Sequence, residues 1–230
     1  MPAAIDGAPR SNRFAAVLFD WRGTLVHDPG HTWWITRALQ GLGRPVLDAE
    51  VTALADAVRG AEQLPTYREA EQWIDTSAAH HREATLRLYA DGGLDPELAD
   101  ALYLLDFDPA SHPFYPDVLE VLTTIHDRGA RIVIVSDIHF DLRAEFTAQG
   151  MAPLIDGFVL SFEHGVQKPD PRMFELALDL VGGRAADALM VGDRASHDGG
   201  AAAVGIATLI LPMPHGPQSR HLGPVVDLLG

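Results

Sequence analysis

Short apolar segments that end at a polar residue recur along this chain, and most are followed by a stretch with helical periodicity. Strands that alternate with helices in this way form βαβ units, whose strands lie parallel with helices on both faces of the sheet. We therefore predict an α/β fold with a doubly wound parallel sheet. The predicted strands are residues 14–19, 131–135, 155–160, 188–191 and 206–211.

Residues 31–106 interrupt this alternation after the first predicted strand. This segment is too long for a loop and too poor in strand patterns to belong to the sheet. We predict an inserted α-helical domain over residues 28–108, and an α/β domain formed by residues 1–27 and 109–230. The predicted helices of the insertion are residues 31–41, 48–63, 67–90 and 95–106.

Charge and composition exclude several kinds of site. The 230 residues include 32 acidic and 17 basic side chains, so the formal net charge is −15, and there is no cysteine. Disulfides, thiolate zinc sites and cysteine nucleophiles are therefore excluded. An acidic surface repels phosphate backbones, and the apolar runs are far shorter than the ~20 residues that cross a bilayer. Because the N-terminus also lacks a signal-peptide pattern, we expect a cytoplasmic monomer or homodimer without nucleic acid or membrane partners.

Chemically complementary side chains come just after the predicted strands. Asp20 follows the first strand, Ser136 and Asp137 follow the second, Lys168 lies in the loop after the third, and Asp193 follows the fourth. Ligands of open parallel sheets bind beyond the carboxyl ends of the strands, so we expect these groups to meet at one edge. Lys168 is the only lysine among the 17 basic residues. Its ammonium is a compact point charge that a guanidinium does not replace.

These residue types predict a phosphoryl-transfer site. Carboxylates at such an edge bind a hard divalent cation such as Mg²⁺, which also binds a substrate phosphate. A carboxylate such as Asp20 can attack phosphorus and form an aspartyl phosphate. Lys168 would neutralise charge on the nucleophile and the phosphoryl oxygens, while Ser136 would hydrogen-bond the latter.

Four segments extend this prediction to a known family. Residues 19–25 read Phe-Asp-Trp-Arg-Gly-Thr-Leu, residues 134–137 read Ile-Val-Ser-Asp, and residues 165–171 read Gly-Val-Gln-Lys-Pro-Asp-Pro. Residues 191–193 read Val-Gly-Asp and are followed by Asp198 and Gly199. In this order along the predicted strands, the segments resemble the four motifs of the haloacid dehalogenase-like (HAD) hydrolases.

The resemblance implies a Rossmann-like core, a helical cap formed by the insertion, Mg²⁺ as cofactor and a small phosphorylated or anionic substrate. Asp20 is then the nucleophile and a metal ligand, together with the backbone carbonyl of Arg22. The residues assigned in this way are Asp20, Ser136 and Lys168 for catalysis, Arg22, Thr24, Ser136, Asp137 and Lys168 for substrate binding, and Asp20, Arg22, Asp193 and Asp198 for the metal.

Arg22 departs from the family pattern. In the family's phosphatases the residue two positions after the nucleophile is an aspartate, which protonates the leaving group and then activates water. Arginine stays protonated at ordinary pH and cannot replace it. The loss of general acid–base catalysis typically costs 10²–10⁴-fold, or roughly 3–5 kcal/mol of barrier. Mg²⁺ binding through the backbone carbonyl would persist, so the substitution affects turnover.

Three interpretations remain open. The chain is a slow or specialised phosphatase, in which another acid acts and Arg22 binds an anionic substrate, or it is a phosphate-binding regulatory module with impaired turnover. The third is a non-phosphatase member of the family. Retention of the Gly-Asp pair at 192–193 disfavours a 2-haloacid dehalogenase, and a phosphonoacetaldehyde hydrolase would need a cap lysine that residues 31–106 lack. Histidines near the motifs titrate close to neutrality and are candidates for the missing acid. They are His139, His164 and His197.

Overall fold

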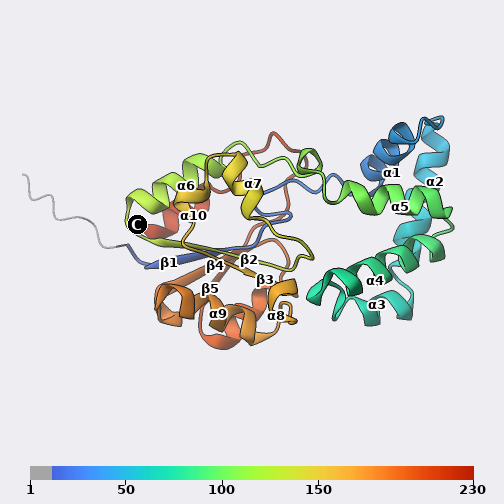
Figure 1. Cartoon of the computed structure of the whole chain (residues 1–230). Coiled ribbons are helices and arrows are strands. Elements are labelled where there is room, and N and C mark those ends of the chain that lie inside the picture. The colour runs from blue at the N-terminus through green and yellow to red at the C-terminus, as the bar shows by residue number, and fades with distance from the viewer. Residues whose placement is uncertain (1–11) are drawn as a thin grey trace, which may run out of the picture.

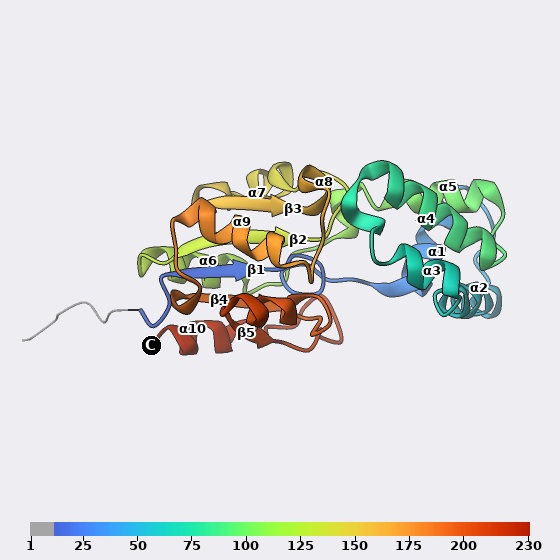
Figure 2. The ribbon, with the colours of Figure 1, turned by 90° about the horizontal axis from the view of Figure 1, so that it is seen from below.

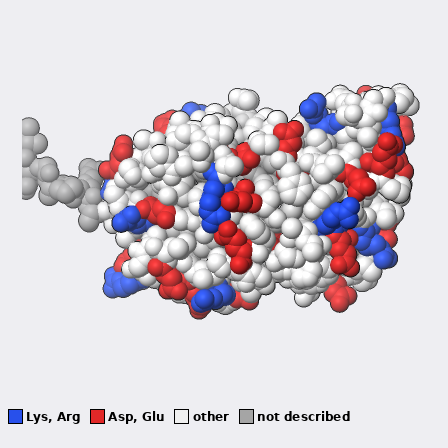
Figure 3. Space-filling model, in the orientation of Figure 1, with Lys and Arg blue, Asp and Glu red and all other residues white. Residues whose placement is uncertain are grey.

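The computed structural model describes residues 12–230. The start of the chain, on which the expectation about a signal peptide rests, lies outside the described residues. Figure 1 shows a layered body built around a sheet, with a group of helices beside it. Acidic and basic side chains are interspersed on the face in Figure 3. Some charged side chains of the protein form ion pairs, as Arg143 and Glu163 do at 2.7 Å.

The sheet confirms the predicted α/β class and its Rossmann-like arrangement. All strand pairs are parallel, and the order is β3-β2-β1-β4-β5. Phe19, the last residue of β1, pairs with Ile134 of β2 and with Val191 of β4, so these strands end close to one another. The strands are β1 (Ala16–Phe19), β2 (Arg131–Ser136), β3 (Gly157–Leu160), β4 (Ala188–Gly192) and β5 (Ala207–Ile210).

Helices cover both faces of the sheet, as Figure 1 shows. Successive side chains of a strand point to opposite faces, which explains the unbroken apolar runs of strands buried on both sides. Val17 and Phe19 join one apolar cluster, whereas Ala16 and Leu18 join the other. The first face carries α6 (Val118–Asp127), α7 (Arg143–Ala148) and α10 (Gly223–Leu229), and the second carries α8 (Ser161–His164) and α9 (Pro171–Val181).

The remaining helices form a region of their own, which we call the helical region. Its apolar cluster includes Ile35, Val58, Leu88 and Leu98, drawn from four different helices. Figure 2 shows this region at the end of the sheet toward which the strands run. The domain boundaries at residues 28 and 108 stay a prediction. Its helices are α1 (Gly30–Gly41), α2 (Asp48–Ala61), α3 (Pro65–Ala70), α4 (Ala78–Asp91) and α5 (Pro96–Leu105).

One predicted helix, over residues 67–90, is wrong as a continuous element. Helix α3 ends at Ala70, and α4 begins only after Ser77, whose hydroxyl accepts a hydrogen bond from the His80 backbone N–H at 3.1 Å. A serine at this position satisfies a free N–H of the first helical turn and so favours a new helix start. The chain between the two helices turns toward the sheet.

Short 3-10 turns complete the structure. No helix among residues 12–230 is long and apolar enough to cross a membrane. The turns are η1 (Ile74–Thr76), η2 (Pro109–Ser111), η3 (Ala152–Leu154), η4 (Ala185–Asp187) and η5 (Asp198–Val204).

Candidate functional site

Four charged side chains meet beyond the ends of β1 and β4, and we call them the rim: Asp20, Lys168, Asp193 and Asp198. The ammonium of Lys168 donates to Asp20 Oδ1 at 2.7 Å and to Asp198 Oδ1 at 2.6 Å. Lys168 is 2% exposed and Asp198 is 1% exposed, so these ion pairs are almost fully removed from water. The backbone N–H of Arg194 donates to the other oxygen of Asp198 at 3.0 Å.

Two glycines make room for the carboxylates of the rim. Gly23 has a φ of +83°, and a Cβ there would lie 2.4 Å from Asp193 Oδ2. A Cβ on Gly192 would lie 2.1 Å from the carboxyl carbon of Asp198. Any larger side chain at either position would displace a rim carboxylate, and at Gly23 it would also strain the backbone.

The rim carries more negative than positive charge. One oxygen each of Asp20, Asp193 and Asp198 lie within 4.8 Å of one another, and a single ammonium faces them. Burial, reinforced by Asp20 and Asp198, raises the pKa of Asp193 to about 7. Burial lowers the pKa of Lys168, but Asp20 and Asp198 outweigh it and hold that pKa above its usual value. Asp193 Oδ1 is buried without a hydrogen-bond partner among the described residues. Clustered, underneutralised carboxylate oxygens fit a hard divalent cation.

The remaining predicted site residues next to the rim differ in their surroundings. Thr24 is fully buried and its hydroxyl donates to Asp20 Oδ2 at 3.2 Å. Ser136 is also fully buried, and its hydroxyl has no partner among the described residues. Asp137 Oδ1 accepts a hydrogen bond from the backbone N–H of Lys168 at 2.8 Å, and burial raises the pKa of Asp137 to about 7.

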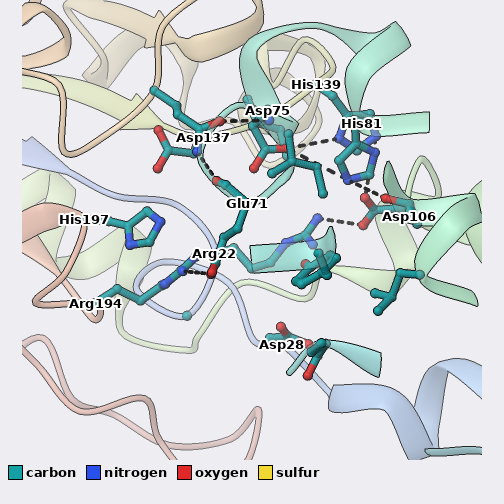
Figure 4. A pocket seen from close by; sticks show the side chains of 18 of the residues that line it. Arg22, Asp28, Glu71, Asp75, His81, Asp106, Asp137, His139, Arg194 and His197 are labelled. Atoms are coloured by element: carbon teal, nitrogen blue, oxygen red, sulfur yellow. Dashed lines mark hydrogen bonds and ion pairs between the residues drawn. The ribbon is translucent and has the colours of Figure 1, made fainter. Parts of the chain in front are cut away.

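A cavity of about 800 Å³ lies between the rim and the helical region. All four rim residues line it, as do Arg22 and Asp137, whereas Thr24 and Ser136 are not part of its lining. The fold therefore brings six of the eight predicted site residues to one cavity. Figure 4 shows several of the side chains that line it, from both the sheet side and the helical region.

Arg22 is paired with a carboxylate of the helical region. Its Nη2 donates to Asp106 Oδ1 at 2.6 Å, at the end of α5. Burial raises the pKa of Asp106, but Arg22 outweighs it and holds that pKa well below its usual value. The guanidinium charge is thus neutralised within the protein, and the predicted role of Arg22 in binding an anionic substrate stays a prediction.

A second group of cavity residues, which we call the wall, was largely missed by the sequence analysis: Asp75, His81, Asp106 and His139. Asp75 Oδ1 lies 3.9 Å from His81 Nε2 and 3.9 Å from His139 Nδ1. The two imidazole rings stack with their centroids 3.4 Å apart and their planes 6° apart. Figure 4 shows Asp75 between Asp137 and the two rings. Only His139 stood beside a motif, so no local signal pointed to Asp75.

The other candidate histidines divide between cavity and surface. His197 lines the cavity, and burial lowers its pKa to about 4. His164 is exposed at the end of α8 and does not line the cavity.

Hydrogen bonds tie the turn that carries Asp75 to the sheet with its covering helices and loops, which we call the sheet domain. The side chain of Gln167 accepts from the Asp75 backbone N–H at 3.0 Å and donates to the Glu71 carbonyl at 2.7 Å. Ser161 Oγ donates to the Asp75 carbonyl at 2.6 Å, and Arg194 pairs with the Glu71 carboxylate at 3.1 Å. Asp75 is therefore held beside the loop that carries Lys168.

Comparison with known proteins agrees with this geometry. Residues 14–205 match the family model of the haloacid dehalogenase-like hydrolases. The chain belongs to this family. It is therefore a hydrolase by family.

Both phosphatases and dehalogenases are among its relatives. The chain is 31% identical over 145 residues to a ribulose-1,5-bisphosphate 5-phosphatase of Halopiger xanaduensis, and the aligned segment covers 59% of each protein. It is 28% identical over 111 residues to (S)-2-haloacid dehalogenase 1 of a Pseudomonas species, and the aligned segment covers 48% of the chain and 49% of that enzyme. The chain thus matches about half to three fifths of these relatives. The HAD-hydrolase YfnB of Bacillus subtilis, solved bound to magnesium, has the same fold, with a TM-score of 0.72, 17% identity, and coverage of 94% and 99%.

Proposed function

We propose that this HAD hydrolase is a Mg²⁺-dependent phosphatase of small phosphorylated metabolites that acts through a phosphorylated Asp20. The observation that carries the proposal is the contact of the Lys168 ammonium with Asp20 at 2.7 Å, beside two further carboxylates and at the edge of a cavity. The phosphatases among the relatives support the substrate class.

The chemistry follows from the rim. A carboxylate oxygen of Asp20 attacks phosphorus, the bond from phosphorus to the leaving oxygen breaks, and an aspartyl phosphate forms. Water then attacks the same phosphorus, and the carboxylate of Asp20 and inorganic phosphate are released. Lys168 neutralises charge on Asp20 and on the phosphoryl oxygens, and the unpartnered hydroxyl of Ser136 is available to donate to one of them.

The carboxylates of Asp20, Asp193 and Asp198, with the carbonyl of Arg22, are the residues that would hold Mg²⁺. The bound ion would supply positive charge for the phosphoryl group, since Lys168 alone does not balance the three carboxylates at this edge. The buried, unpartnered oxygen of Asp193 and the close approach allowed by Gly23 support this assignment.

The test is phosphate release from a panel of phosphate monoesters, including aryl phosphates, with and without Mg²⁺. Release should require Mg²⁺ and disappear in Asp20→Asn. The matched control is Asp127→Asn at the exposed end of α6, which should retain wild-type rates. Activity that survives in Asp20→Asn would remove the nucleophile assignment.

Two other outcomes point to the alternatives. No Mg²⁺-dependent release from any substrate would indicate a phosphate-binding regulatory module. Metal-independent chloride release from 2-haloacids would indicate a dehalogenase. The experiment includes this measurement because two of the relatives are 2-haloacid dehalogenases.

A further inference from the structure

Arg22 cannot donate the proton that a poor leaving oxygen needs, and Asp75 is another acidic residue that lines the same cavity. Asp75 comes from the helical region, but two hydrogen bonds to Gln167 and Ser161 fix its backbone against the sheet domain. Gln167 directly precedes Lys168, and Lys168 contacts Asp20. The same loop therefore positions the nucleophile's partner and the turn that carries Asp75.

The carboxyl group of Asp75 is also free to bind a substrate. It accepts no hydrogen bond from the residues at 12–230, and two imidazole nitrogens lie 3.9 Å from its Oδ1. The other acidic side chains of the cavity outside the rim all accept hydrogen bonds. Glu62 accepts from His31, Glu71 from Arg194, Asp106 from Arg22, Asp28 from Gly30 and Trp34, and Asp137 from Lys168.

Protonation distinguishes Asp75 from the two histidines beside it. Burial raises the pKa of Asp75 to about 6, so part of the population carries a proton near neutrality. Burial lowers the pKa of His81 to about 4 and of His139 to about 3, so both rings are neutral there. The charged or titratable groups that face Asp75 are Arg22, Asp106, Arg194, Lys168, Asp137, His81 and His139.

We propose that Asp75 is the general acid and base of the reaction, in place of the carboxyl group that is absent at position 22. The inference rests on the proposed phosphatase function. As Asp20 attacks phosphorus, the Asp75 carboxyl gives its proton to the leaving oxygen while the bond from that oxygen to phosphorus breaks. The Asp75 carboxylate then takes a proton from the water that attacks the aspartyl phosphate, which returns Asp75 to its acid form and frees Asp20.

A second metal ion is the competing interpretation of this group, because ligand atoms of Asp75, His81 and His139 lie within 4.8 Å of one another. The ring geometry argues against it. Imidazole lone pairs lie in the ring plane, and the two planes are stacked 3.4 Å apart at 6°. One ion at about 2.0–2.1 Å from both rings cannot lie in two separate, nearly parallel ring planes.

Leaving-group dependence tests the proposal in the Mg²⁺-loaded enzyme. p-Nitrophenyl phosphate has a leaving group that needs no proton, whereas an alkyl phosphate such as glycerol phosphate does. Asp75→Asn should lower kcat/KM for the alkyl phosphate by about 10²–10⁴-fold. Its effect on kcat/KM for p-nitrophenyl phosphate should stay below about tenfold, because that ratio covers only the steps up to formation of the aspartyl phosphate. The retained value also reports that the variant is folded and loaded.

Glu69→Gln is the matched control, since it removes an exposed acidic charge of the helical region, in α3, that does not line the cavity. It should change both substrates equally and by less than about twofold. Asp137→Asn is the comparison, because Asp137 also lines the cavity outside the rim and its pKa is also raised by burial. A loss confined to the alkyl phosphate in Asp137→Asn and absent in Asp75→Asn would overturn the assignment.

The remaining outcomes also decide the matter. An equal loss of kcat/KM on both substrates in Asp75→Asn, or no loss, would refute the role of Asp75 as the acid and leave the phosphatase proposal standing. Two metal ions per wild-type chain, of which Asp75→Asn loses one, would establish the metal site in its place. If the wild type hydrolyses neither substrate, both proposals are refuted together.

Discussion

The rim and the wall face each other across one cavity, yet they are built differently. At the rim, Lys168 pairs with Asp20 and Asp198 at 2.6–2.7 Å, and all of these residues belong to the sheet domain. At the wall, contacts join the helical region to the sheet domain, as Arg22 and Asp106 do, and His139 keeps both ring nitrogens buried without a hydrogen-bond partner among residues 12–230.

This difference suggests that the rim and the wall respond to different kinds of change. The rim is held by short, mutually compensating charges and glycine contacts, so it should persist as a preformed anion and metal site. The wall depends on how the helical region docks, and the buried imidazole of His139 lacks the hydrogen bonds that would lower the cost of burial. We therefore expect changes at the rim to act through charge, and changes at the wall to act through docking and pH.

The largest effect should come from removing the ammonium of the rim. Lys168→Gln leaves Asp20 and Asp198 buried without a counter-charge, which typically costs about 3–5 kcal/mol. Phosphate release should fall by at least ~10²-fold, since charge stabilisation at the phosphoryl group is lost. Urea unfolding and phosphate release measure the two effects. Arg143→Gln, which removes an exposed ion pair, should cost less than about 1 kcal/mol. Equal costs for the two variants would contradict a charge-dependent rim.

Breaking the pair between Arg22 and Asp106 tests the wall next. Arg22→Asp places a second carboxylate beside the buried Asp106, so we expect a loss of about 3 kcal/mol in the free energy of unfolding. Exchanging the two residues, with Arg22→Asp and Asp106→Arg together, should recover at least half of that loss. A double-mutant cycle by chemical denaturation gives the coupling energy, and a value near zero would show that the pair does not hold the helical region.

The buried imidazole of His139 should make stability depend on pH. Burial lowers its pKa to about 3 from the ordinary 6.5, so below pH 6.5 the unfolded chain binds a proton that the folded chain does not. The folded state therefore loses about 2 kcal/mol from this group between pH 8 and pH 5. His139→Gln should lack that loss, so its stability relative to wild type should rise on acidification. His164→Gln, at an exposed site, should show no such trend. A pH-independent difference for His139→Gln would mean that its ring is not protonated on unfolding.

The smallest effect should come from filling the space beside Asp193. Gly23→Ala puts a Cβ 2.4 Å from Asp193 Oδ2, and it strains the backbone because the φ of residue 23 is +83°. We expect Mg²⁺ affinity, measured by calorimetry, to fall about tenfold, or about 1.4 kcal/mol, while the wall is unaffected. Gly43→Ala has a similar φ of +65° but open space around it, and should leave the affinity unchanged. Equal Mg²⁺ affinity in Gly23→Ala and wild type would exclude Asp193 as a ligand.

The sequence alone was enough to predict the sheet and the rim, because both depend on local order. Apolar run length and alternation with helices indicated parallel strands, and Asp20 and Asp193 directly follow their strands. Parallel pairing then brings such residues to one edge without further information. The unusual lysine and the arginine at position 22 were visible for the same reason, since each stands inside a recognisable segment.

Only the tertiary structure decided what faces the rim. The turn at residues 71–77 lies inside what the sequence presents as one helix, and its direction depends on contacts with Gln167 and Ser161, 86 to 96 positions away. The pairing of Arg22 with Asp106 spans 84 positions, and the stacking of His81 on His139 joins the helical region to the loop after β2. Such partners are selected by competition for burial and hydrogen bonds among many distant groups, which no local pattern records. The sequence thus determined that an acid is absent at position 22, and the fold determined that Asp75 lines the same cavity as Asp20 and Arg22.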